Sequence, residues 1–236
     1  MNALTRIVVS SFLALSSQVV AQTSLDFNLG GPGETFHESM IFADGGVTVT
    51  ATAWSLSRTA QNPTFEQGQL VQWSPGIGVK SGTETITNVP YVPYYVDNEE
   101  RYDFVLFVFS KKVELSTVKI HPSAGTFDLD ASYWLGNIDS SLDLTGDSLA
   151  SLMSSGFGSR INDDSVASNS PRILDITTPS GGVNALLFGA RINGDANFDR
   201  FKISALGGST VIPEPSSTML ALGALGLALG RRRRCC

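Results

Sequence analysis

The stretch Phe104–Phe109 constrains the fold of this chain more than any other. It reads Phe-Val-Leu-Phe-Val-Phe, six consecutive apolar residues of the β-branched and aromatic types that strands favour. An uninterrupted apolar run of this kind fits a strand that is buried on both faces. We therefore expect Phe104–Phe109 to lie at the centre of a sheet.

The segments around this run also favour a period of two residues over the helical period of 3.6. Apolar and hydroxyl side chains alternate in Val47–Trp54, and Phe127–Trp134 alternates in the same way. Glycine and proline recur at short intervals, and Lys111-Lys112 would form a hairpin after the central strand. Further strands are expected at Leu70–Trp73, continuing through Ile77 and Val79, and at Val113–Ile120, Arg172–Thr177, Ala185–Ile192 and Phe198–Leu206.

One helix is predicted, at Ser148–Ser155, with Asp147 as its N-cap and Gly156 at its end. Roughly nine strands and one short helix indicate an all-β domain, a two-sheet sandwich of jelly-roll type. The expected boundaries are a signal peptide at residues 1–21, the β-sandwich domain at 22–206, a linker at 207–212 and a C-terminal signal with an apolar helix at 213–236.

The charge and the cysteine content of the chain limit the classes of partner and the means of stabilisation that it can have. The net charge of the chain is −6, and removing residues 1–21 and 216–236 would take away five arginines and no acid, which leaves −11. An acidic surface of this size repels phosphate backbones, so we expect no nucleic-acid partner. The only cysteines are Cys235 and Cys236, so an exported domain would have no disulfide to stabilise it.

Both ends of the chain carry targeting features. At the N-terminus, Arg6 precedes the apolar run Ile7–Leu15, and small residues lead to an expected cleavage between Ala21 and Gln22. At the C-terminus, the triplet Pro213-Glu214-Pro215 precedes an apolar run at Thr218–Gly230. This run has 13 residues, fewer than the roughly 20 of a permanent membrane helix. Four arginines follow it: Arg231, Arg232, Arg233 and Arg234.

This order of triplet, short apolar run and basic cluster resembles the PEP-CTERM sorting signal of bacterial proteins that exosortases process. The resemblance implies that the export machinery and an exosortase are partners, that the C-terminal helix enters the inner membrane transiently, and that the protein ends up secreted or on the cell surface. A permanent anchor is an alternative, since Gly226–Gly230 forms a GxxxG pattern. A GPI signal would need a polar spacer that this tail lacks, and prenylation would need a cytosolic chain.

The domain between the signals is similar to the family of exosortase-dependent surface proteins. The similarity spans most of Leu70–Leu206. Its motifs are Gly76-Ile77-Gly78-Val79, Val96-Asp97-Asn98, Ser132-Tyr133-Trp134-Leu135-Gly136, Leu186-Leu187-Phe188-Gly189-Ala190 and Asp199-Arg200-Phe201-Lys202-Ile203. A histidine often precedes the Val-Asp-Asn motif by two residues in this family, and Tyr94 stands there in this chain. The resemblance implies a secreted surface protein and brings no established reaction.

Two sets of residues are candidate ligand sites. Oxygen-bearing side chains occur at every second residue of the loop Asn193, Asp195, Asn197 and Asp199, a spacing that suits calcium. Asp128 with Asp130 is another acidic pair. The second set would form a face for exopolysaccharide: Tyr91, Tyr94, Tyr95, Asp97 and Asn98.

An enzymatic function is not expected. The sequence Gly146-Asp147-Ser148-Leu149 matches the nucleophile motif of GDSL esterases, but the histidines of this chain, His37 and His121, both precede it. The downstream base that such a serine requires is therefore missing. We expect a non-enzymatic protein of the bacterial surface or extracellular matrix. The alternative is a carbohydrate-binding module that recognises exopolysaccharide.

Overall fold

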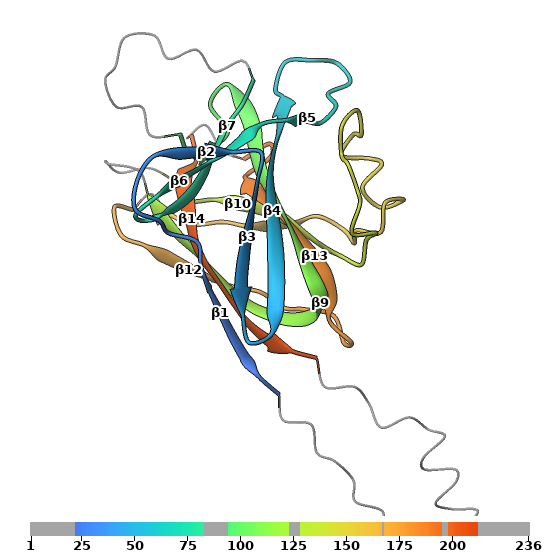
Figure 1. Ribbon diagram of the computed structural model, residues 1–236. Helices are drawn as coiled ribbons and strands as arrows, with labels where there is room; N and C mark the ends of the chain where they lie inside the picture. Colours follow the sequence, from blue (N-terminus) through green and yellow to red (C-terminus); the bar gives the residue numbers. More distant parts are fainter. Residues whose placement is uncertain (1–21, 83–93, 123–127, 167, 195–197, 212–236) are drawn as a thin grey trace, which may run out of the picture. The chain divides into compact units, whose positions relative to one another are not determined.

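The computed structural model describes residues 22–82, 94–122, 128–166, 168–194 and 198–211. These residues form an all-β fold in which antiparallel strands belong to a single hydrogen-bonded sheet (Figure 1). The strands are β1 (Ser24–Asn28), β2 (Thr35–His37), β3 (Ser39–Asp44), β4 (Val47–Ser57), β5 (Glu66–Gln67), β6 (Gln69–Trp73), β7 (Gly76–Lys80), β8 (Val96–Asp97), β9 (Arg101–Pro122), β10 (Ala131–Gly136), β11 (Ile161–Asp163), β12 (Arg172–Asp175), β13 (Val183–Ala190) and β14 (Arg200–Thr210).

Strand β9 is the central strand of this sheet and pairs with four others. Its first half, which contains Phe104–Phe109, lies between β4 and β13, with Leu106 opposite Thr52 on one side and Leu187 on the other. Its second half pairs with β14 and β12. The predicted central position of Phe104–Phe109 is therefore confirmed.

The two halves of β9 are joined by a bulge and not by the hairpin predicted at Lys111-Lys112. On β13, Val183 faces Val113 and Ala185 faces Val108, so an advance of two residues on β13 corresponds to five on β9. The extra residues of β9 are exposed. They let β9 exchange its partner β4 for β14 without reversing direction. The hairpin prediction was wrong because a charged pair marks an exposed bulge as readily as a turn.

Alternate residues of β9 point into two hydrophobic clusters on opposite faces of the sheet. Val105, Phe107 and Phe109 belong to the larger cluster, to which most of the other strands contribute. Phe104 and Leu106 belong to a smaller cluster. The smaller cluster is covered by side chains outside the strands: Phe65, Ile138, Leu144, Leu152 and Phe157. The described strands thus form one sheet with packing on both faces, and the separate second sheet of a sandwich is not seen.

The described residues contain no helix, so the helix predicted at Ser148–Ser155 was wrong. This segment forms successive turns instead, in which the amide of Ser151 donates to the carbonyl of Ser148 at 3.1 Å. The hydroxyl of Ser151 donates to the same carbonyl at 2.9 Å, and the Ser154 hydroxyl donates to the carbonyl of Ser151. Such local side-chain bonds compete with helical pairing.

The end of the domain also differs from the prediction. Residues 207–210, expected in a linker, are part of β14; all four pair with β9, and residues 207–209 also pair with β1. A Cβ atom on Gly208 would lie 2.5 Å from the carbonyl oxygen of Glu114, so glycine is required there by close packing of two strands and not by flexibility. The strand predicted at Phe198–Leu206 therefore ended too early, because β14 continues to Thr210.

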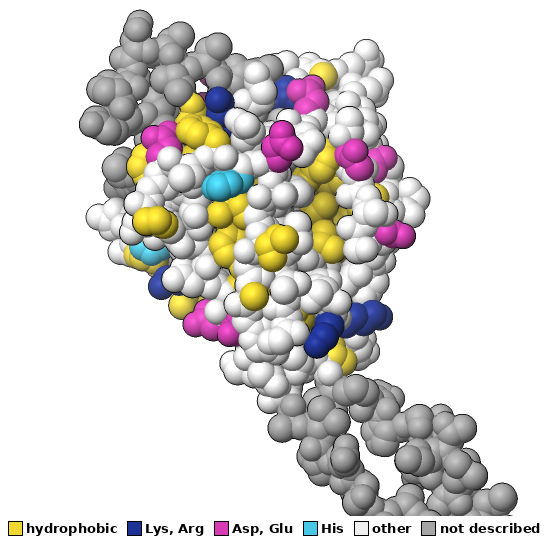
Figure 2. All heavy atoms as spheres, viewed as in Figure 1, with side chains coloured by type: hydrophobic (Ala, Val, Ile, Leu, Met, Phe, Trp, Pro, Cys, Tyr) yellow, Lys and Arg dark blue, Asp and Glu magenta, His cyan; other side chains and the backbone are white. Residues whose placement is uncertain are grey.

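The surface is acidic and carries few large apolar groups. Figure 2 shows the charged side chains of one face dispersed singly or in small groups among uncharged ones. Ile41 is 71 % exposed on β3 and Ile173 is 61 % exposed on β12. Within the described residues, no helix has the length and hydropathy of a membrane span. The predicted apolar helix after Pro215 lies outside them.

Replacing a core side chain of β9 tests the central role of this strand. Phe107 is fully buried in the larger cluster, so Phe107→Ala should lower the free energy of unfolding by about 3–5 kcal/mol. The exposed Ile41 offers a control, and Ile41→Ala should change stability by less than about 0.5 kcal/mol. Urea unfolding followed by tryptophan fluorescence measures both, and equal losses in the two variants would contradict the assignment of β9 as the core strand.

Candidate functional site

Three buried aspartates meet where β10 and β14 begin. Asp128 and Asp130 precede β10, and Asp199 precedes β14. One carboxylate oxygen from each lies within 4.8 Å of those of the other two. A parallel bridge between Asp128 and Asp199 brings the two segments together, and the amide of Arg200 donates to the carbonyl of Asp128 at 3.2 Å. We call Asp128, Asp130 and Asp199 the acidic centre.

Hydrogen bonds from the backbone and from Asn98 hold Asp199 in place. Its Oδ1 accepts from the amide of Asp130 at 2.9 Å, and its Oδ2 accepts from Nδ2 of Asn98 at 2.6 Å. Asn98 in turn accepts from the amide of Asp199 at 2.9 Å and donates to the carbonyl of Arg191 at 3.1 Å. These bonds connect the β8–β9 turn to the segments that precede β10 and β14. The acidic centre therefore joins three parts of the sheet.

The other two carboxylates are held by the segment before β12. Oδ1 of Asp128 accepts from the amide of Leu129 at 2.9 Å and from the hydroxyl of Ser165 at 3.0 Å. The amide of Ser165 donates to Asp130. The geometry is therefore fixed by local and distant backbone groups, as a preformed binding site requires.

The charge of the centre is not balanced by its surroundings. Nη1 of Arg191 lies 3.5 Å from Oδ2 of Asp130 and also pairs with Asp164. No other salt bridge reaches the centre from the described residues. Burial, and then the charges of Asp130 and Asp128, raise the pKa of Asp199 to about 7. Burial also raises the pKa of Asp130. The centre therefore favours a bound proton or a cation.

The ligand types indicate which cation could bind. Carboxylates and carbonyl oxygens are the ligands of hard cations such as calcium and magnesium, whereas zinc sites in proteins use mainly histidine and cysteine. No histidine or cysteine belongs to this group of described residues. The acidic centre could thus hold a hard metal ion.

The calcium loop predicted from sequence contributes one residue to this centre. Asp199 belongs to it, whereas Asp195 and Asn197 lie outside the described residues. Asn193 stands in a turn with a φ of 55°, and its side chain accepts a hydrogen bond from the Tyr102 hydroxyl at 3.2 Å. The acidic pair Asp128 and Asp130 was visible in the sequence, but nothing in the sequence showed that it faces Asp199, about seventy residues later.

The predicted polysaccharide face is not assembled as an exposed aromatic surface. Tyr94 and Tyr95 are 2 % and 8 % exposed, and Tyr91 lies outside the described residues. Burial raises the pKa of Asp97 to about 6. Asn98 serves the acidic centre instead of a ligand surface. The described part of the chain therefore does not present the two tyrosine rings as a platform for sugars.

The serine of the GDSL-like motif lies in the turns that follow β10. Its hydroxyl accepts a hydrogen bond from the amide of Ser151 at 3.3 Å, and the Ser148 amide donates to the Ser151 hydroxyl at 3.0 Å. His37 and His121 belong to β2 and β9. The expected absence of catalysis remains a prediction.

Comparison with known proteins identifies the end of the chain. Residues 211–234 match the model of the PEP-CTERM protein-sorting motif. No curated protein and no solved structure matches the chain. The sorting signal predicted from Pro213-Glu214-Pro215 and the four arginines is thereby confirmed, and the resemblance of the domain to exosortase-dependent surface proteins stays a prediction.

The raised pKa of Asp199 predicts how stability depends on pH. In the absence of metal, the folded state retains a proton on Asp199 that the unfolded chain releases near pH 4, so unfolding becomes easier as the pH rises from about 4 to 7. The loss should be on the order of a few kcal/mol. The Asp199→Asn side chain cannot titrate, so this variant should show a flatter dependence of the free energy of unfolding on pH. It also loses one hydrogen bond, which lowers stability equally at every pH.

Urea unfolding in EDTA at pH 5 and pH 8 measures this difference. The matched control is Asp175→Asn, which removes an exposed carboxylate from β12 and should keep the slope of the parent. If Asp199→Asn and the parent lost the same stability between pH 5 and pH 8, the acidic centre would not hold a proton in the folded state.

Proposed function

We propose that this protein is a non-catalytic component of the bacterial surface or extracellular matrix, delivered by export and trimmed by an exosortase. The PEP-CTERM motif carries the proposal, because it implies an exported protein that an exosortase processes. The match begins at Val211, directly after the last residue of β14. The matched motif therefore starts at the residue that follows β14 in the sequence.

The arrangement of the domain ends supports removal of both signals. Strands β1 and β14 run side by side and antiparallel, with Ser24 opposite Ser209 (Figure 1). The amide of Thr23 donates to the hydroxyl of Thr210 at 3.0 Å, and the amide of Thr210 donates to the carbonyl of Thr23 at 2.9 Å. Cleavage after Ala21 and beyond Thr210 would leave every described strand intact.

The fold of the domain supports a structural function. Both faces of the first half of β9 are covered. Within the described part of the chain, the hydrogen bonds of Ser148 are made to Ser151 in the same turn and not to a histidine. A stable surface without a disulfide suits a protein that acts by its position outside the cell.

Calcium at the acidic centre would supply the stability that disulfides give to other exported domains. The ion would join Asp128, Asp130 and Asp199, and thus the starts of β10 and β14, by neutralising carboxylates that are costly to bury. Extracellular calcium modules bind the ion with dissociation constants of about 10⁻⁴–10⁻³ M. Calcium would act here as a structural ion.

Processing is tested on the protein isolated from its native cell surface. Intact-mass analysis should show a chain without residues 1–21 and without the region after Pro215. Replacing Pro213, Glu214 and Pro215 together by alanine should leave the arginine cluster attached. Pro179→Ala, in the exposed loop between β12 and β13, is the control and should be processed normally. Recovery of parent chains that still carry Arg231–Arg234 would refute exosortase processing.

Calcium binding is tested by thermal unfolding. If calcium binds only the folded state, a concentration of about 100 times its dissociation constant should raise the free energy of unfolding by roughly 2.7 kcal/mol. The increase should be larger at pH 8 than at pH 5, because protons compete for Asp199. Asp199→Asn should abolish the increase and Asp175→Asn should retain it. A melting temperature that millimolar calcium leaves unchanged in chelated protein would rule out the calcium site.

A further inference from the structure

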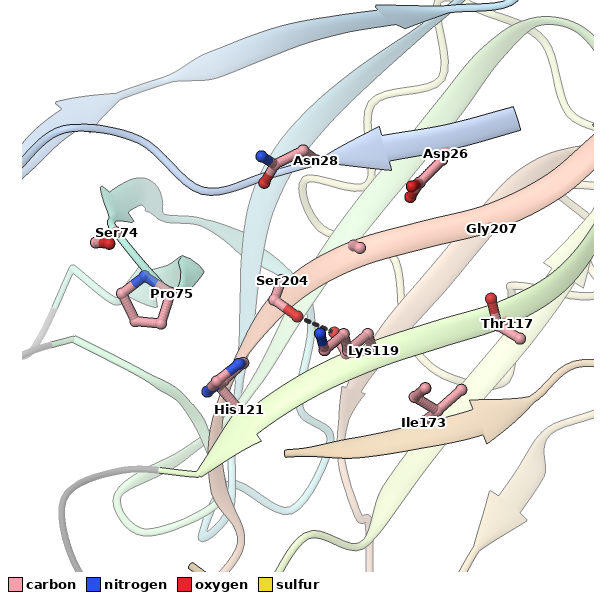
Figure 3. Close-up of a pocket in the computed structure, with 11 residues that line it drawn as sticks. Asp26, Asn28, Ser74, Pro75, Thr117, Lys119, His121, Ile173, Ser204 and Gly207 are labelled. Carbon is pink, nitrogen blue, oxygen red and sulfur yellow. Dashed lines mark hydrogen bonds between the residues drawn. The ribbon is translucent and has the colours of Figure 1, made fainter. Parts of the chain in front are cut away.

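A groove runs along the outer surface of β14, where the outward side chains are small. Ser204 and Gly207 form its floor (Figure 3), and Ala205 of the same strand also lines the groove. The pairing with β9 shifts register between Ile203 and Ala205, which brings the consecutive residues Ser204 and Ala205 to the same surface. A Cβ atom on Gly207 would lie 2.4 Å from Oγ1 of Thr117, so a larger residue would displace the neighbouring wall. We call this feature the β14 groove.

The neighbouring strands form the walls of the β14 groove. Asp26 and Asn28 of β1 stand on one side of the floor in Figure 3, and Thr117, Lys119 and His121 of β9 stand on the other. The volume is about 490 Å³, which is in the range of small-molecule sites.

The turn between β6 and β7 closes one end of the groove with Ser74 and Pro75. Gly76, the first residue of β7, has a φ of 146°, and a Cβ atom there would lie 2.3 Å from the carbonyl oxygen of Ile203. The turn is therefore packed directly against β14, so this end wall is part of the folded sheet.

The polar ends of the wall residues are available to a ligand. The Asp26 carboxylate, the Lys119 ammonium and the His121 ring form no hydrogen bond or salt bridge within the part of the chain that the structure describes. The floor is partly engaged, since the Ser204 hydroxyl donates to the carbonyl of Lys119 at 3.0 Å. The groove therefore offers both donors and acceptors along its length.

The charges in the groove nearly cancel. Asp26 and Lys119 stand on opposite walls of the groove, with Asn28 directly across from Lys119. Burial together with the charge of Lys119 lowers the pKa of His121, which favours the uncharged ring. An uncharged imidazole donates from one nitrogen and accepts at the other. This set of groups matches hydroxyl groups, which also donate and accept, better than it matches phosphates or carboxylates.

We propose that the β14 groove binds a segment of an uncharged polysaccharide. The open shape suits a chain that enters and leaves the groove, and the mixed donors and acceptors suit sugar hydroxyls. The proposal does not depend on exosortase processing. It gives carbohydrate recognition a location different from the tyrosine face predicted from sequence.

Other occupants fit less well. A protein partner is disfavoured because Ile173 is the one large exposed apolar side chain among the described lining residues. One such side chain does not form the buried apolar centre that protein interfaces have. Nucleic acids and acidic polysaccharides would meet the overall negative charge of the domain and would have Lys119 as their cationic contact in the groove. A neutral polymer pays no such electrostatic cost.

Affinity electrophoresis of the full-length protein in detergent tests this proposal. Gels containing hydroxyethyl cellulose serve as the neutral probe, and gels containing alginate serve as the carboxylated probe. The parent should be retarded by the neutral polymer and not by alginate. Retardation by alginate alone, or by neither polymer, would overturn the proposed ligand class.

Two pairs of variants locate the binding. Ala205→Trp fills the groove and should abolish retardation, whereas Ala43→Trp adds the same bulk to an exposed position on β3 and should not. Lys119→Ala should raise the dissociation constant for the neutral polymer by about 5-fold, the effect of losing one hydrogen bond. Its control, Lys112→Ala, removes an equal charge from the exposed bulge of the same strand and should leave the dissociation constant unchanged. Retardation that survives Ala205→Trp in a variant with parental melting temperature would place the binding elsewhere.

Discussion

The packing of β9 on both of its faces is the constraint on which the rest of the structure depends. Because side chains alternate along a strand, Phe107 and its odd-numbered neighbours are buried on one face, while Phe104 and Leu106 are buried on the other. The larger cluster is enclosed by other strands, and the smaller one is covered by the turns after β10 and by Phe65. The segment 137–160 therefore has a packing function, although it contains little regular structure.

The bulge in β9 lets one strand serve two groups of partners. Before it, β9 pairs with β4 and β13, and after it with β14 and β12. The change in partners brings β14 beside β1, so that both ends of the domain finish together. The same pairing leaves the outer surface of β14 between two walls, which creates the β14 groove. The bulge in β9 precedes its pairing with β14, and the separate register shift between Ile203 and Ala205 lies at the floor of the proposed ligand site.

The acidic centre adds a polar constraint at another edge of this fold. Its carboxylates are buried, and the backbone amides of distant segments point at them. Such an arrangement is costly unless a proton or a cation neutralises part of the charge, since one arginine lies 3.5 Å from Asp130 while three carboxylates are gathered. The centre is therefore the place in the described structure where a bound proton or cation would change the stability of the domain.

The sequence by itself determined the features that depend on local pattern. The sorting signal is a contiguous motif, and Phe104–Phe109 signals a doubly buried strand through its uninterrupted apolar character. The all-β class follows from period-two alternation in the same way. Where local pattern was ambiguous, as in the serines after Asp147 or in Gly207-Gly208, the prediction failed. A helix and a linker were expected there, and turns and a paired strand were found.

Only the tertiary structure decided which distant residues share a site. Asp199 meets Asp128 and Asp130 because the starts of β10 and β14 are joined by a bridge, and Asn98 reaches Asp199 from the turn between β8 and β9. Tyr94 is buried because of what packs around it and not because of its own chemistry. The register of long-range strand pairs sets these positions, and residues about seventy apart in the chain carry no local signal of that register.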